Sequence, residues 1–209
     1  MKPILYKTIL LSLLFPVILQ AQRFDAGLRG GIGASQIGGD DLRGYNKPGL
    51  YTGIYTSIDL TDRSRISLEI NYIEKGSRKY ARPDKEIYKA YKLMLNYVEI
   101  PIAYEYFLHE NLSFSGGLSY GVLLNREDNE EDESGVIPDT KPFRNYELAV
   151  NLAAHGWINE TWGIGIRHSL SIIPVRTYKD GDSRIYNTPY GPFKPQLIGL
   201  LRFFVTYQF

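Results

Sequence analysis

Alternating apolar and polar residues occupy most of the chain. In the segment RISLEINY at 65–72 every second residue is apolar, and LSFSGGLSYGVLL at 112–124 follows the same rule. Successive side chains of a β-strand point to opposite faces, so a period of two indicates strands with one apolar and one polar face. Six further segments alternate less strictly, at 23–34, 50–60, 93–107, 146–158, 162–173 and 196–209.

The connections between these eight segments alternate in length. Short polar turns lie at 61–64, 109–111 and 159–161, whereas the connections at 35–49, 73–92, 125–145 and 174–195 are long. Transmembrane barrels built from hairpins have this arrangement, with short turns on the periplasmic side, long loops outside and strands of about 9 to 11 residues. The pattern therefore predicts an all-β fold, an eight-stranded antiparallel up-and-down transmembrane β-barrel.

A soluble sandwich or lipocalin-like barrel would also alternate, but it would bury its apolar face. In this chain the opposite rows are rich in charge, with Arg29, Asp59, Glu69, Glu99, Glu105, Glu147, Arg167 and Arg202. An eight-stranded barrel has a lumen just wide enough for side chains to fill. We therefore expect the apolar rows to face lipid and these charges to neutralise one another inside, as a polar network. A structural role for that network is favoured over a functional one.

The last strand, LLRFFVTYQF at 200–209, ends the chain on an aromatic residue. We expect it to pair with the first strand, because hydrocarbon does not tolerate an open sheet edge. Its outward aromatics then belong to the interfacial girdle. Phe203, Tyr207 and Phe209 resemble the C-terminal signal of Gram-negative outer-membrane proteins, which the barrel-assembly machinery reads. This predicts the outer membrane as the location, with its lipid and lipopolysaccharide as partners.

The first 22 residues have the order of a secretory signal peptide: Lys2 and Lys7, an apolar run from Ile9 to Leu19, and then Ala21. This predicts a signal peptide at 1–22 and a barrel domain at 23–209. The alternative, a membrane anchor, is disfavoured because the apolar run is shorter than the ~20 residues that a spanning helix needs. The absence of cysteine excludes disulfides and lipoprotein anchoring.

Composition supports a sheet protein without nucleic-acid partners. The 17 Tyr, 9 Phe and 20 Gly are typical of strands and of the places where strands bend. The chain has 24 basic and 23 acidic residues, and removal of Lys2 and Lys7 leaves it close to neutral. Nucleic acid is therefore not an expected partner.

Several segments resemble one family. LRGGIGAS in the first strand, YNKPGLYTGIY before and in the second, LEINYIEKGSR in the third and LNYVEIPIAYEY in the fourth are similar to the PorT-like, porin-like outer-membrane β-barrel proteins of Bacteroidota. The most specific points are Lys75-Gly76 and Pro101 after Glu99, and the second half matches only in its strand and loop pattern. The resemblance implies an eight-stranded barrel but no particular activity. It also implies a possible accessory role in secretion or other envelope complexes.

Neither a pore nor an active site is expected. Eight strands leave no aqueous channel, and Tyr51, Tyr55, Tyr97 and Trp157 are expected to fill the lumen. His168 and Ser169 are neighbours in the sequence, so they point to opposite faces and cannot pair as base and nucleophile. His155 is expected to be a hydrogen-bonded lumen residue. No spacing indicates a metal site, and no cofactor is expected.

The long loops carry opposite charges. Residues 73–92 hold seven basic and three acidic side chains, and residues 125–145 hold three basic and seven acidic ones. The two loops can clasp each other, bind lipopolysaccharide phosphates or divalent cations, contact a partner, or simply be solvated. The candidate partner contacts are the acidic run Glu130, Glu131, Asp132 and Glu133 and the aromatic cluster Tyr178, Tyr186, Tyr190 and Phe193. That cluster also suits a loop folded over the barrel mouth.

Two classes of function follow. The first is a non-enzymatic barrel that acts as a structural or accessory subunit of an outer-membrane or protein-secretion complex, together with larger outer-membrane proteins. The second is a monomeric surface binder whose long loops recognise a ligand. A narrow porin and a catalytic barrel are less favoured.

Overall fold

The structure is a computed structural model of the 209-residue chain. It describes residues 24–39, 44–81, 83, 90–125, 130–137, 142–179 and 193–209. For residues 177–179 and 193–194 it describes the backbone alone. The segment predicted as a signal peptide lies outside the described residues, so the cleavage of residues 1–22 stays a prediction.

Eight long strands form the body of the molecule: β1 (Phe24–Gly38), β2 (Lys47–Thr61), β3 (Ser64–Lys79), β4 (Tyr91–His109), β5 (Leu112–Leu123), β8 (Tyr146–Trp157), β9 (Trp162–Ser171) and β11 (Phe193–Gln208). Three short strands lie in the long connections: β6 (Glu130–Asp132), β7 (Gly135–Val136) and β10 (Arg176–Lys179). All neighbouring long strands are antiparallel.

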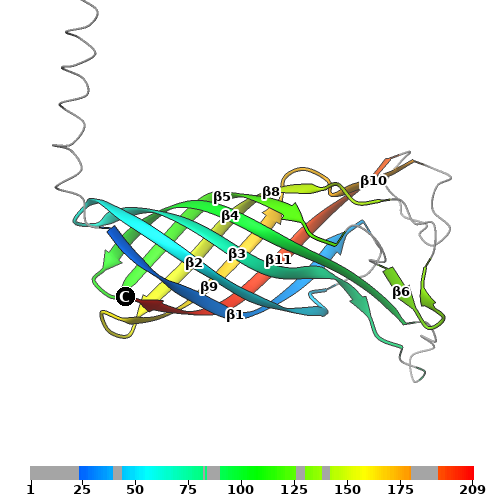
Figure 1. Cartoon of the computed structure of the whole chain (residues 1–209), viewed down its shortest axis with the longest axis horizontal. Helices are drawn as coiled ribbons and strands as arrows, with labels where there is room; N and C mark the ends of the chain where they lie inside the picture. Colours follow the sequence, from blue (N-terminus) through cyan, green and yellow to red (C-terminus); the bar gives the residue numbers. More distant parts are fainter. Residues whose placement is uncertain are drawn as a thin grey trace, which may run out of the picture.

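The sheet closes on itself. The strand order β3-β2-β1-β11-β9-β8-β5-β4 returns to its start because β3 also pairs with β4. The first and last strands pair from Gly27↔Gln208 to Gly38↔Leu197. The predicted eight-stranded barrel, with the last strand paired against the first, is confirmed. Figure 1 shows the start of β1 and the C-terminus at the same end of the barrel, beside the short turns.

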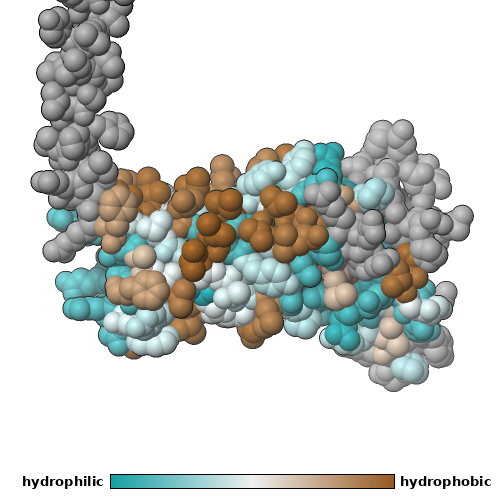
Figure 2. Space-filling model, viewed as in Figure 1, coloured by the Kyte–Doolittle hydropathy of each residue, from teal (hydrophilic) through white to brown (hydrophobic). Residues whose placement is uncertain are grey.

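Large apolar side chains cover the outside of the barrel, as the brown band in Figure 2 shows. Leu28, Ile54 and Leu118 are 45%, 55% and 58% exposed. Two groups of ring contacts border this apolar belt. The ring centres of Trp162 and Tyr207 lie 4.9 Å apart at the end where β1 begins and β11 ends. Toward the other end, the rings of Tyr120 and Tyr146 stack with their centres 6.2 Å apart. These are the interfacial aromatics of a surface that faces hydrocarbon.

The strands run further than the alternation of apolar residues predicts. β3 continues to Lys79 and β4 begins at Tyr91, so nine of the twenty residues of the predicted loop 73–92 are paired strand. In this extension the pattern is reversed, because Leu93 and Leu95 are buried inside while the neighbouring Lys92 is partly exposed. Outside a membrane a strand faces water, so its polar face points outward. The reversal marks where the barrel leaves the apolar belt.

Candidate functional site

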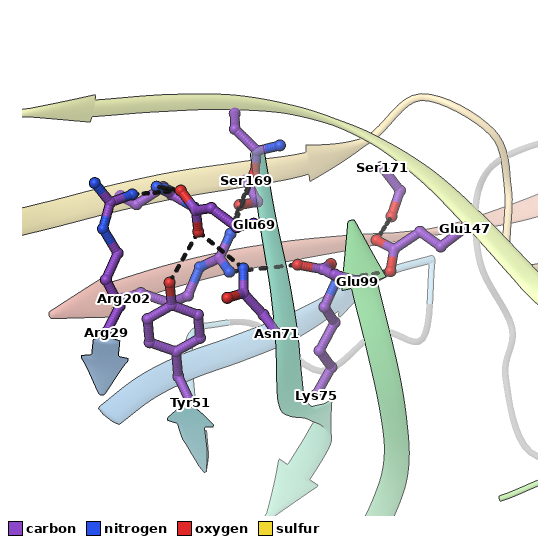
Figure 3. Close-up of polar contacts among 12 residues, drawn as sticks. Arg29, Tyr51, Glu69, Asn71, Lys75, Glu99, Glu147, Ser169, Ser171 and Arg202 are labelled. Carbon is purple, nitrogen blue, oxygen red and sulfur yellow. Dashed lines mark hydrogen bonds and ion pairs between the residues drawn. The ribbon is translucent and has the colours of Figure 1, made fainter. Parts of the chain in front are cut away.

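The centre of the lumen is built around the carboxylate of Glu69, which points inward from β3 and is fully buried. Arg29 on β1 donates to Oε1, and Arg167 on β9 donates to both oxygens at 2.6 and 2.9 Å. Tyr51 and Asn71 donate to Oε2 at 3.2 and 2.9 Å. One carboxylate therefore holds two guanidinium groups from different strands, as Figure 3 shows for the Arg29 side.

A second group of charges lies next to the first, toward the outer end (Figure 3). Lys75 on β3 donates to Glu99 on β4, and also to Glu147 on β8 at 2.6 Å. Arg202 on β11 lies 3.3 Å from Glu99, and Ser171 donates to Glu147. Every carboxylate in this group contacts a cation or a hydroxyl donor. The lumen is thereby closed by paired charges rather than lined by free ones.

Seven of the eight charged residues expected in the lumen have buried side chains: Arg29, Glu69, Glu99, Glu105, Glu147, Arg167 and Arg202. Six of them belong to the two groups above. Glu105 lies apart, where Ser113 donates to it and His155 Nδ1 is 3.5 Å away. With Lys75, the set contains four cations and four carboxylates, so it has no net charge.

Two charged residues differ from expectation. Lys75, assigned to the basic exterior loop, is fully buried in the lumen, because β3 continues past Tyr72 and places it on the same face as Glu69. Asp59, assigned to the lumen, has a side chain that is 39% exposed and lies 3.2 Å from Arg65. It stands at the rim, where β2 is about to turn into β3.

Gly76 accounts for the backbone next to Lys75. Its φ of 144° lies in a region that side chains rarely adopt, and a Cβ there would come within 2.0 Å of the carbonyl oxygen of Leu93. Only glycine fits this close approach of β3 to β4. The Lys75-Gly76 pair therefore positions the lumen cation.

Aromatic rings fill the space between the charges. Tyr51, Tyr55 and Tyr97 are buried, with exposed fractions of 2%, 4% and 0%. Phe204 lies between the guanidinium groups of Arg29 and Arg167, 5.5 and 5.4 Å from its ring centre. These contacts add cation–π attraction to the ion pairs. They also leave little space in the middle of the barrel.

An apolar layer and a buried arginine close the outer end. The apolar layer belongs to one core cluster, and each of its residues is at most 1% exposed: Leu93, Leu95, Ile198 and Leu200. Above them Arg176 of β10 is also buried.

Arg176 links the long connection before β8 and the long connection before β11 to the last strand. It donates to Glu130 of β6 and, at 3.0 Å, to Gln196 of β11, and its guanidinium lies 4.0 Å from the ring centre of Phe143. Tyr91 of β4 also donates to Glu130, at 2.9 Å. This is a mouth closed by contacts between the outer segments.

The acidic run 130–133 is divided by the structure. Glu130, expected on the surface, is buried with 3% exposure, because its carboxylate turns inward to Arg176. Glu131 pairs with Lys92 at 3.2 Å and is partly exposed, so the acidic and basic segments do clasp each other. Asp132 and Glu133 accept backbone N–H groups of Ser134 and Ala90. Glu131, Asp132 and Glu133 remain candidates for partner contacts.

The aromatic cluster of the last long connection is described only in part. Tyr178 and Phe193 lie in β10 and β11, which pair with each other, but their side chains are not described. Tyr186 and Tyr190 lie outside the described residues. Their proposed partner contacts stay predictions.

The aromatic residues of the last strand lie on the outer surface. Phe203, Tyr207 and Phe209 are 55%, 37% and 77% exposed. The ring centres of Tyr207 and Phe209 are 5.7 Å apart, and the N–H of Phe209 donates to the carbonyl of Ala26. The backbone N–H of the terminal residue is therefore paired with β1, while its aromatic ring is exposed, and its role as an assembly signal stays a prediction.

We expect deletion of Phe209 to reduce the amount of assembled barrel in cells while leaving refolding into detergent almost unchanged. The deletion removes one backbone hydrogen bond, which contributes about 1 kcal/mol, together with the expected recognition signal. Heat-modifiable mobility on gels measures both quantities. Replacing Phe209 by Trp, which keeps an aromatic terminus, is the control. Normal assembly of the deletion variant in cells would contradict the signal assignment.

The candidate catalytic residues point away from each other. Ser169 is buried beside Asn151, whereas His168 is exposed on the outer face and accepts or donates a hydrogen bond of 2.8 Å with Tyr45. Among the described residues, no cluster of three metal-ligating side chains occurs. In the same part of the chain no helix is both long and apolar enough to cross a membrane.

Sequence reasoning missed several lumen residues. Lys75, Asn151, Ser169 and Ser171 all contact the charged groups. The sequence did contain a signal for them, because residues an even number of positions apart in a strand share a face. Lys75 is six positions from Glu69, and Ser169 is two positions from Arg167. Parity along a strand, followed past the end of the apolar row, would have identified all four.

A family model of the outer membrane protein β-barrel domain matches residues 20–176. No curated protein matches the sequence. Among solved structures, Ail, the attachment invasion locus protein of Yersinia pestis, is 10% identical, with 88% of this chain and 98% of that chain covered and a TM-score of 0.52. At this identity the likeness concerns the fold alone.

Two further structures resemble the chain less closely. Neisserial surface protein A is 9% identical, with 90% of this chain and 99% of that chain covered and a TM-score of 0.45. OprG from Pseudomonas aeruginosa is 10% identical, with 90% and 97% covered and a TM-score of 0.43.

Proposed function

The chain belongs to the family of outer membrane protein β-barrel domains, and from this premise we propose that it is a non-enzymatic structural or accessory subunit of an outer-membrane assembly. The family places the protein in the outer membrane. The finer assignments, a PorT-like subfamily and a secretion or assembly complex, are part of the proposal.

The observation that carries the proposal is the filled lumen. Arg29 and Arg167 are held by Glu69, and Lys75 by Glu99 and Glu147, across the middle of the barrel. The apolar layer and Arg176 lie between these groups and the outside. A barrel closed in this way has little means to conduct solutes, so its function has to depend on its surfaces.

The outer end supplies a suitable surface. The contacts Arg176–Glu130 and Lys92–Glu131 join β4, β6 and β10 into one platform, so the described loop segments are held in place. A preformed surface binds a partner with a smaller loss of conformational entropy than mobile loops do. Glu131, Asp132 and Glu133 give it acidic groups that suit a basic partner.

Three other functions are alternatives to this one. A monomeric surface binder is favoured by a pocket of about 220 Å³ beside Arg78, Tyr80 and Lys92 on the same platform. An enzyme is disfavoured by the outward position of His168, away from Ser169. A narrow porin would give steady single-channel currents in planar bilayers, and we expect none from the wild-type protein.

The test is purification of the full-length native protein from outer membranes in mild detergent. We expect larger envelope proteins to copurify. Charge reversal of Glu131, Asp132 and Glu133 to Lys is expected to weaken this association, whereas reversal of Asp62 and Glu110, in the turns at the opposite end, is the matched control. A native protein that migrates alone under these conditions would support the surface binder and contradict the subunit role.

A further inference from the structure

We propose that Arg78 and Lys92 form an anion site on the outside of the barrel for the phosphate- and carboxylate-bearing inner sugars of lipopolysaccharide. The two residues are direct partners across β3 and β4. This outer anion site is a proposal separate from the partner complex, because its binding groups are two cations of the barrel wall. Lys92 also contacts Glu131 of the acidic platform, so the two surfaces adjoin.

The first argument is the cross-strand pair itself. Residues that lie directly opposite each other in an antiparallel pair have Cβ atoms about 4.5 to 5.5 Å apart, and like charges at that distance repel. In the described structure Arg78 makes no ion pair with a carboxylate. Lys92 Nζ lies 3.2 Å from Oε2 of Glu131, and both side chains are more than one-third exposed. An anion between the two cations would remove the repulsion.

The second argument is the geometry around Arg78. Its guanidinium lies 4.4 Å from the ring centre of Tyr80, which holds the planar group in one orientation and leaves its edge free for hydrogen bonds. Beside it is the pocket of about 220 Å³, which Arg78, Lys79 and Lys92 line together with Glu131 and Asp132. A guanidinium fixed by stacking suits bidentate recognition of a phosphate or carboxylate.

The third argument is the local electrostatic potential. Lys47 begins β2 at the outer end, and burial lowers the pKa of its amine. The carboxylate of Glu74 acts against this change, and the charges of Lys92 and Arg78 add to it. Three cations therefore act on one another in this region.

The position of the site selects the ligand. On β3 the outward row remains lipid-like up to Tyr72, and on β4 it becomes so from Val98. Arg78 and Lys92 each lie six residues beyond these positions, which at ~3.3 Å per residue and a tilt of ~40° is about 15 Å above the apolar belt. That is above the lipid A phosphates and at the height of the first core sugars.

The experiment uses the full barrel in detergent micelles and three probes: lipopolysaccharide with its inner core, lipid A without core sugars, and inorganic phosphate as competitor. Core-bearing lipopolysaccharide is expected to bind the wild type at least about tenfold more tightly than the R78Q/K92Q variant, since charge-assisted hydrogen bonds are lost. Lipid A is expected to bind both alike. Phosphate and higher salt should weaken only the wild-type interaction with the core-bearing probe.

Two further variants separate binding from general effects. R63Q removes an exposed arginine from the turn at the opposite end and should leave binding unchanged. E131Q frees Lys92 from its carboxylate and should tighten binding, a result that a purely structural role does not give. Equal binding of core-bearing lipopolysaccharide by the wild type and R78Q/K92Q, with both shown to be folded by heat-modifiable mobility, would overturn the proposal. The proposal would also be overturned if lipid A bound the wild type more tightly than R78Q/K92Q by the same factor as core-bearing lipopolysaccharide.

Discussion

Replacing Lys75 by Met is expected to lower the free energy of unfolding by about 3 to 5 kcal/mol, the range found when one partner of a buried ion pair is removed. Lys75 is fully buried and donates to both Glu99 and Glu147. Glu99 keeps Arg202 at 3.3 Å, but Glu147 is left with Ser171 alone among its contacts described above. Methionine fills a similar volume, so the loss of stability reflects the missing charge more than a cavity.

The matched control is Lys79→Met on the same strand. Lys79 lies at the outer end of β3 and is partly exposed, so the same substitution should change stability by less than about 0.5 kcal/mol. Adding Glu147→Gln to Lys75→Met should recover part of the loss, because the orphaned carboxylate becomes neutral. Urea unfolding in lipid or detergent, followed by tryptophan fluorescence, measures all three variants. Equal stability of Lys75→Met and Lys79→Met would contradict the lumen network.

The fold could be predicted because a membrane barrel has a strict local pattern. Each lipid-facing position must be apolar and each neighbour must face the lumen, so residues such as Leu68 and Glu69 identify their faces without tertiary information. The strand count and the inward position of seven of the eight expected lumen charges followed from this rule. Closure by the last strand followed from the intolerance of hydrocarbon for an open sheet edge.

The pattern failed where the membrane ends. Beyond Tyr72 and before Val98 the outer surface meets water, so the outward positions become polar and the apolar residues Leu93 and Leu95 turn inward. An alternation rule based on lipid therefore reads residues 73–92 as loop, although β3 continues to Lys79. For that reason Lys75 was assigned to the exterior.

Pairing partners were not predictable either. Sequence parity places Arg29, Arg167 and Glu69 in one lumen, but which cation reaches which carboxylate depends on strand register and tilt. The burial of Glu130 depends on Arg176, which lies 46 positions away in the chain. Contacts at such separations are set by how the outer segments fold onto the mouth, and no local signal carries them.

The second large effect is expected from a charge on the lipid face. Val150 on β8 is 38% exposed and pairs with Leu118 and Leu170, which are 58% and 47% exposed. It lies four residues from Tyr146 of the outer aromatic group, well within the apolar belt. Val150→Arg should reduce stability by about 2 to 4 kcal/mol, the cost of a cation near the bilayer midplane.

Val136→Arg tests whether the cost comes from the membrane. Val136 on β7 is 48% exposed, more than Val150, but it lies in the outer segments beyond the belt. A protein surrounded by water would tolerate both substitutions equally, with changes within about 0.5 kcal/mol. Equilibrium folding into lipid vesicles gives both values. We expect a clear loss for Val150→Arg alone, because only that guanidinium has to be moved out of hydrocarbon, and equal values would contradict the position of the belt on the barrel wall.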